Sequence, residues 1–282
     1  MSETQSHNNH YYVPNPSAYP ILMSSGVFLL VLGFIMWVNS YNFGNVTMIA
    51  GAALITIILF GWLGAVINES ESGSYNKWED RSFRIGMTWF IASEVAFFAA
   101  FFGALYYVRI ISVPGLAAPD QLWEGFTAVW PSAGPMGDKF SPMGAWGIPA
   151  INTALLLTSG ATLTWAHWGL LANKRAQLIL GMFLTVALGV AFIGLQAYEY
   201  YEAYTHLGLT MGAGAYGATF FMLTGFHGFH VTLGTIMLIV ILVRCLKGHF
   251  KPDNHFGFEG VAWYWHFVDV VWLGLFIFVY WL

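Results

Sequence analysis

Five ionisable residues interrupt long apolar stretches of this sequence. Glu94 lies in one stretch, His227 and His230 lie in a second, and His266 and Asp269 lie in a third. Residues three apart on a helix share one face, so each of the last two stretches would present its two groups together. Carboxyl and imidazole groups can hold protons, and histidines beside a carboxylate can also bind a metal ion. The five residues could therefore meet in one buried polar cluster.

Three interpretations of this cluster remain open. Polar side chains can hydrogen-bond across helices and hold a bundle together. A carboxyl group among apolar side chains, such as Glu94, can instead be a protonatable site. A metal site would use His227, His230 or His266, but the spacing His-x-x-His is common and no four-ligand set can be recognised. We predict no metal ligands and no catalytic residues, and we assign as protonatable groups Glu94, His227, His230 and Asp269.

The composition is that of a membrane protein. Hydrophobic residues make up 57% of the chain and charged residues only 9%, far below the value of about a quarter that is usual in soluble domains. The net charge of −4 is spread thinly, which argues against nucleic-acid binding. The single cysteine, Cys245, excludes an internal disulfide and a cysteine-built metal cage. An intramembrane enzyme would need a nucleophile with a base, and neither is visible.

Seven apolar stretches are long enough to cross a membrane as helices, because about 20 apolar residues span the hydrocarbon layer. They cover residues 21–38, 46–67, 85–108, 148–172, 178–198, 215–243 and 260–282. The sequence thus predicts an all-α, polytopic membrane protein with seven transmembrane helices. We divide it into a disordered tail at 1–19, a two-helix hairpin at 20–67, a polar linker at 68–82 and a five-helix bundle at 83–282.

Basic residues gather on one side of the predicted membrane. Of the 10 Lys and Arg residues, only Arg109 and Lys139 fall on the side opposite to the N-terminus. Loops in the cytoplasm are enriched in Lys and Arg. The N-terminus is therefore expected in the cytoplasm, or in the equivalent matrix compartment, and the C-terminus outside.

Four motifs follow one another along the chain. The last and longest is HFGFEGVAWYWHFVDVVWL at residues 255–273. The earlier ones are Ser93-Glu94-Val95 followed by two Phe pairs, a span-four motif from Asn152-Thr153 to His167, and a span-six motif from Tyr216-Gly217 to Val231. All four resemble motifs of the cytochrome c oxidase subunit III family. The similarity covers all seven spans and weakens in the first two.

The resemblance implies a non-redox subunit of a proton-translocating respiratory oxidase that reduces oxygen to water. Members of this family carry no haem or copper, which are held by partner subunits. They bind beside subunit I in a complex that also contains subunit II and receives electrons from cytochrome c. The first two helices are expected to be splayed from the other five and to form a cleft that holds phospholipids. The subunit is expected to stabilise subunit I and to support proton uptake.

The same resemblance implies roles for individual residues. The carbodiimide-reactive carboxyl group of the family falls on Glu94, and its arginine for a lipid phosphate falls on Arg244. We expect Trp62 and His230 to contact lipid as well. The family often has Trp-Trp-Arg-Asp-Val at the end of span two, where this chain has Trp-Leu-Gly-Ala-Val from Trp62 onward. A second contact to a lipid phosphate is therefore missing from the pattern.

Two other functions remain as alternatives. The subunit III of a quinol oxidase resembles this family but typically has five spans. A stand-alone proton or ion carrier would be expected to show inverted repeats and helices broken near the midplane. The only proline inside a predicted span is Pro149, at the start of span four. The long loop between spans three and four favours a bacterial plasma membrane over the mitochondrial inner membrane.

Overall fold

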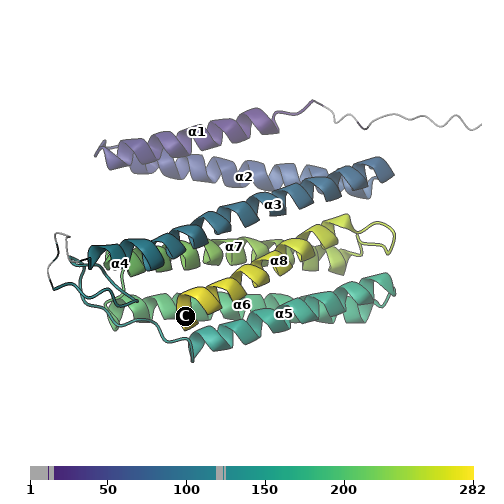
Figure 1. The fold of residues 1–282 in the computed structure, drawn as a ribbon. Helices are drawn as coiled ribbons and strands as arrows, with labels where there is room; N and C mark the ends of the chain where they lie inside the picture. Colours follow the sequence, from purple (N-terminus) through teal and green to yellow (C-terminus); the bar gives the residue numbers. More distant parts are fainter. Residues whose placement is uncertain (1–11, 13–15, 119–122, 124) are drawn as a thin grey trace, which may run out of the picture. The chain divides into compact units, whose positions relative to one another are not determined.

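The computed structural model of this chain describes residue 12 and residues 16–118, 123 and 125–282 (Figure 1). These residues form helices joined by turns and loops, and the described part of the chain contains no named strand. Most of the tail predicted at 1–19 lies outside the described residues. The prediction of an all-α fold is confirmed.

Six helices in the described residues are long and apolar enough to cross a membrane. They are α1 (Tyr19–Val38), α2 (Gly44–Glu71), α3 (Lys77–Tyr107) with η1 (Val108–Ser112) and α4 (Val113–Leu116), α6 (Arg175–Thr205), α7 (Gly214–Lys247), and α8 (Phe256–Leu275) with η2 (Phe276–Trp281). Helices of this length and apolar character are typical of membrane spans. The chain is therefore a multi-pass membrane protein.

The fourth predicted span corresponds to α5 (Ile148–Leu171), which has 24 residues but is not among those six helices. Its threonine, serine, asparagine and histidine residues lower its hydropathy. Two of these polar groups face the protein, because Asn152 and Ser159 are completely buried. About 20 residues suffice to cross the hydrocarbon layer. The transmembrane placement of α5 stays a prediction, which its length and its buried polar groups support.

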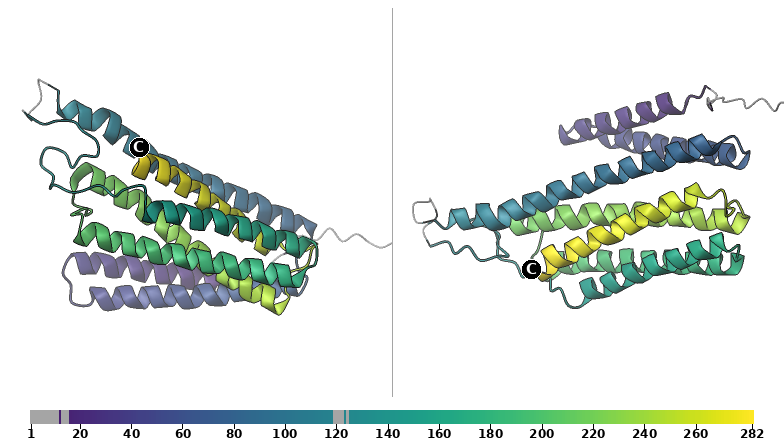
Figure 2. Two further views of the ribbon diagram at one scale, coloured as in Figure 1. Left: turned by 90° about the horizontal axis from the view of Figure 1, so that it is seen from below. Right: turned by 45° about the vertical axis from the view of Figure 1, so that its right-hand side comes forward.

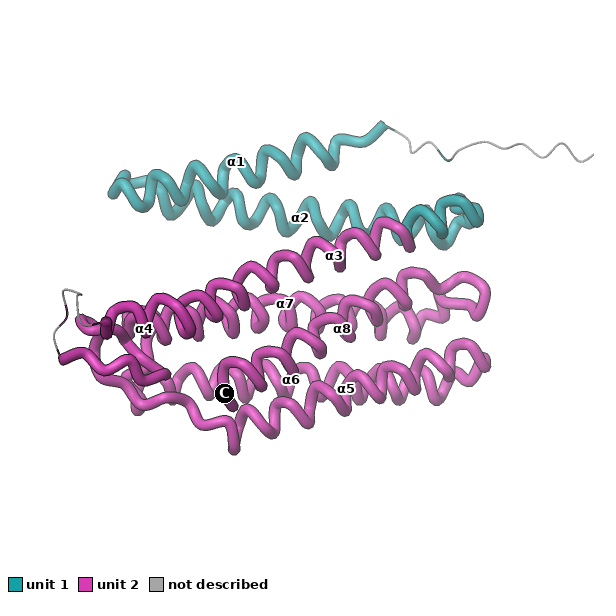
Figure 3. The backbone as a smooth tube through the Cα atoms, viewed as in Figure 1, with its two compact units in different colours: residues 1–83 teal, residues 84–282 magenta. Residues whose placement is uncertain are grey.

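The chain divides into two compact units, residues 1–83 and residues 84–282 (Figure 3). In the first unit, α1 and α2 form an antiparallel hairpin joined by a short turn at 39–43. The buried residues of these two helices are all glycines, namely Gly26, Gly33, Gly44 and Gly51. A Cβ atom at Gly33 would lie 2.2 Å from the backbone nitrogen of Met48. The two helices therefore pack backbone to backbone, as small residues allow in membranes.

Polar residues connect α2 to α3 in the first unit. The two helices extend into the predicted polar linker, so that only residues 72–76 lie between them. The backbone N–H of Asn76 donates to Glu79 Oε2 at 2.8 Å, which satisfies a donor at the start of α3. The hydroxyl of Tyr75 donates to Glu69 Oε2 at 2.7 Å. Burial and this bond raise the pKa of Tyr75.

The second unit contains a packed core. Helices α5, α6, α7 and α8 run alongside one another in this unit, as both views in Figure 2 show. Its largest fully buried side chains include Trp265, Trp272 and Phe192. Gly189 and Gly234 make room for the indole of Trp265, since a Cβ atom at Gly234 would lie 2.8 Å from that ring. The core thus combines large aromatic side chains with glycines on facing helices.

Candidate functional site

Glu94 and His230 meet inside the second unit. Glu94 lies on α3 and His230 lies on α7, and the distance from Glu94 Oε2 to His230 Nε2 is 2.9 Å. The side chain of Glu94 is 19% exposed and that of His230 is 10% exposed, so both are largely buried. Two of the five ionisable residues that could form one cluster therefore meet.

The hydrogen bond of the second ring nitrogen of His230 determines where the proton of the bond to Glu94 can lie. Nδ1 lies 2.6 Å from the backbone oxygen of Phe226, and a carbonyl can only accept a hydrogen bond. The proton of that bond therefore sits on Nδ1, so a neutral His230 has a bare Nε2. The bond to Glu94 then contains one proton, carried either by the carboxyl group or by an imidazolium ring. A hydrogen bond between Glu94 and His230 thus requires one proton between them, on either partner.

Aromatic rings pack around this pair. The ring of Phe98 lies 5.1 Å from the ring of His230, and the rings of Phe97 and Tyr264 lie 6.1 Å and 6.3 Å from it. Tyr264 also donates its hydroxyl to the backbone oxygen of His230 at 3.3 Å. Apolar surroundings lower the local dielectric, which strengthens the hydrogen bond between the two side chains.

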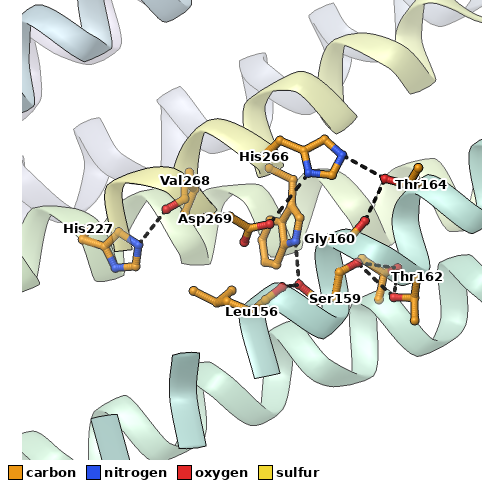
Figure 4. A network of polar contacts seen from close by, with 11 residues as sticks. Leu156, Ser159, Gly160, Thr162, Thr164, His227, His266, Val268 and Asp269 are labelled. Carbon is orange, nitrogen blue, oxygen red and sulfur yellow. Dashed lines mark hydrogen bonds and ion pairs between the residues drawn. The ribbon is translucent and has the colours of Figure 1, made fainter. Parts of the chain in front are cut away.

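His227 lies one turn before His230 on α7 and makes a different contact (Figure 4). Its Nε2 lies 3.2 Å from the backbone oxygen of Val268 on α8, so Nε2–H donates to that carbonyl. The side chain is completely buried, and its ring packs against Phe192 and Trp272. The bond joins α7 to α8, which supports the structural interpretation of this histidine.

Asp269 and His266 form a separate polar group on α8 (Figure 4). Asp269 Oδ2 lies 3.8 Å from His266 Nδ1, and His266 Nε2 lies 3.4 Å from Thr164 Oγ1 on α5. Gly160 of α5 makes room for the carboxyl group, since a Cβ atom there would lie 2.5 Å from Asp269 Oδ2. The two predicted carboxyl groups thus pair with different histidines and do not meet in one cluster.

Two of the residues expected to bind lipid lie in different units. Arg244 is in the last turn of α7, and its guanidinium group stacks over the ring of Phe250 at 4.4 Å. Trp62 lies on α2 in the first unit, and its ring stacks on the ring of Tyr19 at 6.1 Å. Each side chain is therefore held by an aromatic neighbour. Their role in lipid binding stays a prediction.

Two polar groups of the second unit were not predicted from the sequence. Glu199 on α6 is completely buried, and the hydroxyl of Tyr280 donates to it at 2.6 Å. Glu199 lies one residue beyond the end of the span predicted at 178–198. A carboxyl group so close to a long apolar stretch is a sequence signal that could have identified it. The second group contains His167, His255 and Glu259, whose ligand atoms all lie within 4.8 Å of one another. His255 and Glu259 are four residues apart, which is a local signal that the sequence analysis did not use, whereas the distant position of His167 gives no signal of this contact.

The fold and these contacts define a multi-pass, all-α membrane protein whose intramembrane carboxyl groups are paired with histidine or tyrosine side chains. Residues 7–282 match the family model for cytochrome c oxidase subunit III. The chain belongs to the cytochrome c oxidase subunit III family.

Curated relatives are similar to this chain over almost their whole length. The cytochrome c oxidase subunit 3 of Marchantia polymorpha is 41% identical over 282 residues, which are 100% of this chain and 98% of the relative. Those of Phoca vitulina and Latimeria chalumnae are 40% and 41% identical over 278 residues, which are 98% of this chain and 98% of each relative. As a member of this family, the chain is a subunit of an oxidoreductase complex and works beside other oxidase subunits.

Proposed function

We propose that this chain is the non-redox subunit III of a proton-translocating cytochrome c oxidase and that it supports proton uptake by the complex. The observation that carries the proposal on proton uptake is the 2.9 Å contact between Glu94 and His230. Either partner can carry the proton between them. The pair can therefore accept a proton at one of the two side chains and release it from the other. Haem and copper belong to the partner subunits in this proposal, and no residue of this chain is catalytic.

The exposed surface supports a role inside an assembly. Large hydrophobic side chains are exposed on α3 and α7, such as Trp89 and Phe229 at 73% and 58%. Within a membrane, lipid tails or the helices of a partner cover such side chains. We assign subunit I as the main partner, subunit II to the same complex, and cytochrome c as the electron donor. The chain stabilises subunit I through this apolar surface.

Two observations argue against the alternative functions. Helices α6 and α7 run unbroken for 31 and 34 residues, whereas carriers typically use helices interrupted near the midplane. A stand-alone ion carrier is therefore disfavoured. The match to the cytochrome c oxidase family over residues 7–282 favours cytochrome c over quinol as the electron donor.

The proposal also covers phospholipid binding and the orientation of the chain in the membrane. Arg244, Trp62 and His230 help to hold phospholipid, and a basic residue at the membrane surface contributes about 1 kcal/mol to the attraction for anionic lipid. Arg244 shares the last turn of α7 with Lys247, so positive charge gathers there. We place this end and the N-terminus in the cytoplasm, the C-terminus outside, and the protein in a bacterial plasma membrane.

The substitution Glu94→Gln tests the role of the shared proton. A glutamine amide can still donate a hydrogen bond to His230, so the contact is kept while the exchangeable proton is lost. In the assembled oxidase we expect most oxygen reduction to remain, with slower proton uptake or a shorter turnover lifetime. Hydrophobic carbodiimide should label the wild-type chain at near-neutral pH but not the variant. The control is Asp138→Asn, the same chemical change at an exposed loop position.

Two outcomes would contradict this role for Glu94. Complete loss of oxygen reduction in a fully assembled, haem-replete complex would place Glu94 on an obligatory path. Unchanged proton uptake, lifetime and pumping would leave the pair with a structural role only. Subunit composition and haem content of the purified complexes distinguish both outcomes from failed assembly.

A further inference from the structure

Three side chains with metal-binding atoms meet at one end of the second unit. His167 lies one turn before the end of α5, His255 directly precedes α8, and Glu259 lies in the first turn of α8. Glu259 Oε1 lies 3.4 Å from His255 Nε2 and 3.8 Å from His167 Nε2. The rings of the two histidines are 5.4 Å apart. Two imidazole nitrogens thus converge on one carboxylate oxygen.

The nitrogen of His255 that faces Glu259 is the one suited to a metal ion. His255 Nδ1 lies 3.1 Å from the backbone oxygen of Lys251, so Nδ1 carries the proton of that bond. A neutral His255 therefore turns a lone pair on Nε2 toward the carboxylate. The Nε2 atoms of His255 and His167 are both buried and have no hydrogen-bond partner in the described part of the chain. The lone pair on each Nε2 atom and the negative oxygen of Glu259 repel each other unless a cation lies between them.

The spacing of these three atoms is close to what a small divalent cation needs, although the 3.8 Å between Glu259 Oε1 and His167 Nε2 would have to shorten by about half an ångström on binding. Tetrahedral zinc with bonds of about 2.0–2.1 Å places its ligand atoms about 3.3 Å apart, close to the shorter of the two distances to Glu259 Oε1. Two histidines and one carboxylate form a ligand set that zinc accepts, with water in the fourth position. We propose that His167, His255 and Glu259 bind a zinc ion that fastens the end of α5 to the start of α8.

Neighbouring residues hold these ligands in position. Arg84 forms an ion pair with Glu259 Oε2, which leaves Oε1 facing the two histidines. The Lys251 carbonyl fixes the tautomer and the ring orientation of His255, as outer partners of metal ligands commonly do. The ring of Phe258 packs 5.2 Å from that of His167. This site is independent of the shared proton on Glu94 and His230.

Zinc titration of the full chain in mild detergent tests the proposal. We expect one equivalent of Zn²⁺ to bind, and Mg²⁺, which prefers oxygen ligands, not to displace it. His167→Gln and His255→Gln should each weaken zinc binding by more than about 100-fold, beyond the roughly 10–100-fold cost of losing an outer partner. His206→Gln is the matched control, because His206 is exposed at the opposite end of α6 from the turn that joins α5 to α6. It should leave zinc binding unchanged.

A second measurement does not depend on the variants being folded. Zn²⁺ should raise the thermal unfolding temperature of the wild-type chain, and Co²⁺ in its place should give the absorption of a tetrahedral site. The proposal is overturned if the wild-type chain shows no saturable binding and no thermal shift. It is also overturned if the double variant His167→Gln/His255→Gln, with intact helical circular dichroism, binds zinc as tightly as the wild type. Protonated histidines that hold Glu259 as a plain ion pair would give the first of these results.

Discussion

The two units of this protein hold their helices together by different means. In the first unit, α1 and α2 approach each other through glycines, and a Cβ atom at Gly51 would lie 2.4 Å from the backbone nitrogen of Leu30. Hydroxyl groups of these helices, such as that of Thr56, donate to carbonyls of their own helix. In the second unit, polar side chains bond from one helix to another, as Trp265 does to Ser159 at 2.8 Å.

This difference separates two ways of building a helical membrane protein. Backbone packing through glycines relies on van der Waals contact and needs no ionisable side chain at the interface. Cross-helix hydrogen bonds require donors and acceptors inside the membrane, where an unpaired polar group is costly. The second unit therefore provides the setting in which carboxyl groups such as Glu94 and Glu199 can be kept within spanning helices, each with a bonded partner.

The largest expected effect is in the core of the second unit, at Trp265. The substitution Trp265→Ala removes a completely buried indole and its bond to Ser159, and it leaves a cavity between α5, α6, α7 and α8. We expect the free energy of unfolding to fall by about 3–5 kcal/mol, measured by circular dichroism in mixed detergent micelles. The matched control Trp168→Ala, at a side chain that is 61% exposed, should change it by less than about 0.5 kcal/mol. Equal losses would contradict a packed core in this unit.

The next effect concerns the glycine contact of the first unit. Gly51→Leu would push a side chain into the backbone of α1, and we expect a loss of about 3 kcal/mol, at the upper end of overpacking costs. Hydrogen exchange should show less amide protection in α1 and α2, with α5 to α8 unchanged. Gly64→Leu on the same helix is the control, because a Cβ atom there meets no heavy atom within 4 Å. If both variants behaved alike, close backbone packing would not be what joins the hairpin.

Much of the fold can be predicted from the sequence because membrane spans are set by local composition. Long apolar stretches predict α1, α2, α3, α6, α7 and α8. The ends of helices are harder to predict, since a helix can continue into polar sequence beyond the hydrocarbon layer. Helix α3 begins at Lys77, well before the predicted start at residue 85. Helix α5 shows a different problem. Its polar residues face the protein and lower its mean hydropathy, so its composition marks it less clearly as a membrane span.

Contacts between distant residues are less predictable, because they depend on how each helix is rotated. The depth of Glu94 and His230 in their spans allowed a contact, and the structure places them 2.9 Å apart. The same reasoning allowed one common cluster, but Asp269 faces α5 and lies beside His266 instead. Sequence spacing gives depth along a helix and the residues that share a face. It does not say which neighbouring helix that face meets.

The smallest of the three expected stability effects is the loss of one hydroxyl group, which we compare between the two units. Tyr280→Phe removes the donor to Glu199, whose side chain is completely buried and whose Oε2 has no hydrogen-bond partner among the described residues. The carboxyl group would then lose a bond that the apolar surroundings cannot replace. We expect the free energy of unfolding to fall by about 1–2 kcal/mol, because a cross-helix bond is lost and a polar group is left unpaired.

The counterpart in the first unit is Thr56→Val, which keeps the shape of the side chain and removes its hydroxyl. That hydroxyl donates to the backbone oxygen of Ala52 at 2.8 Å and joins no other helix, and the side chain is exposed. We expect a change of less than about 0.5 kcal/mol in the same detergent assay. A Tyr280→Phe effect no larger than that of Thr56→Val would show that Glu199 does not depend on its cross-helix donor. Polar bonding between helices would then no longer distinguish the second unit from the first, and aromatic packing around Trp265 would account for its stability alone.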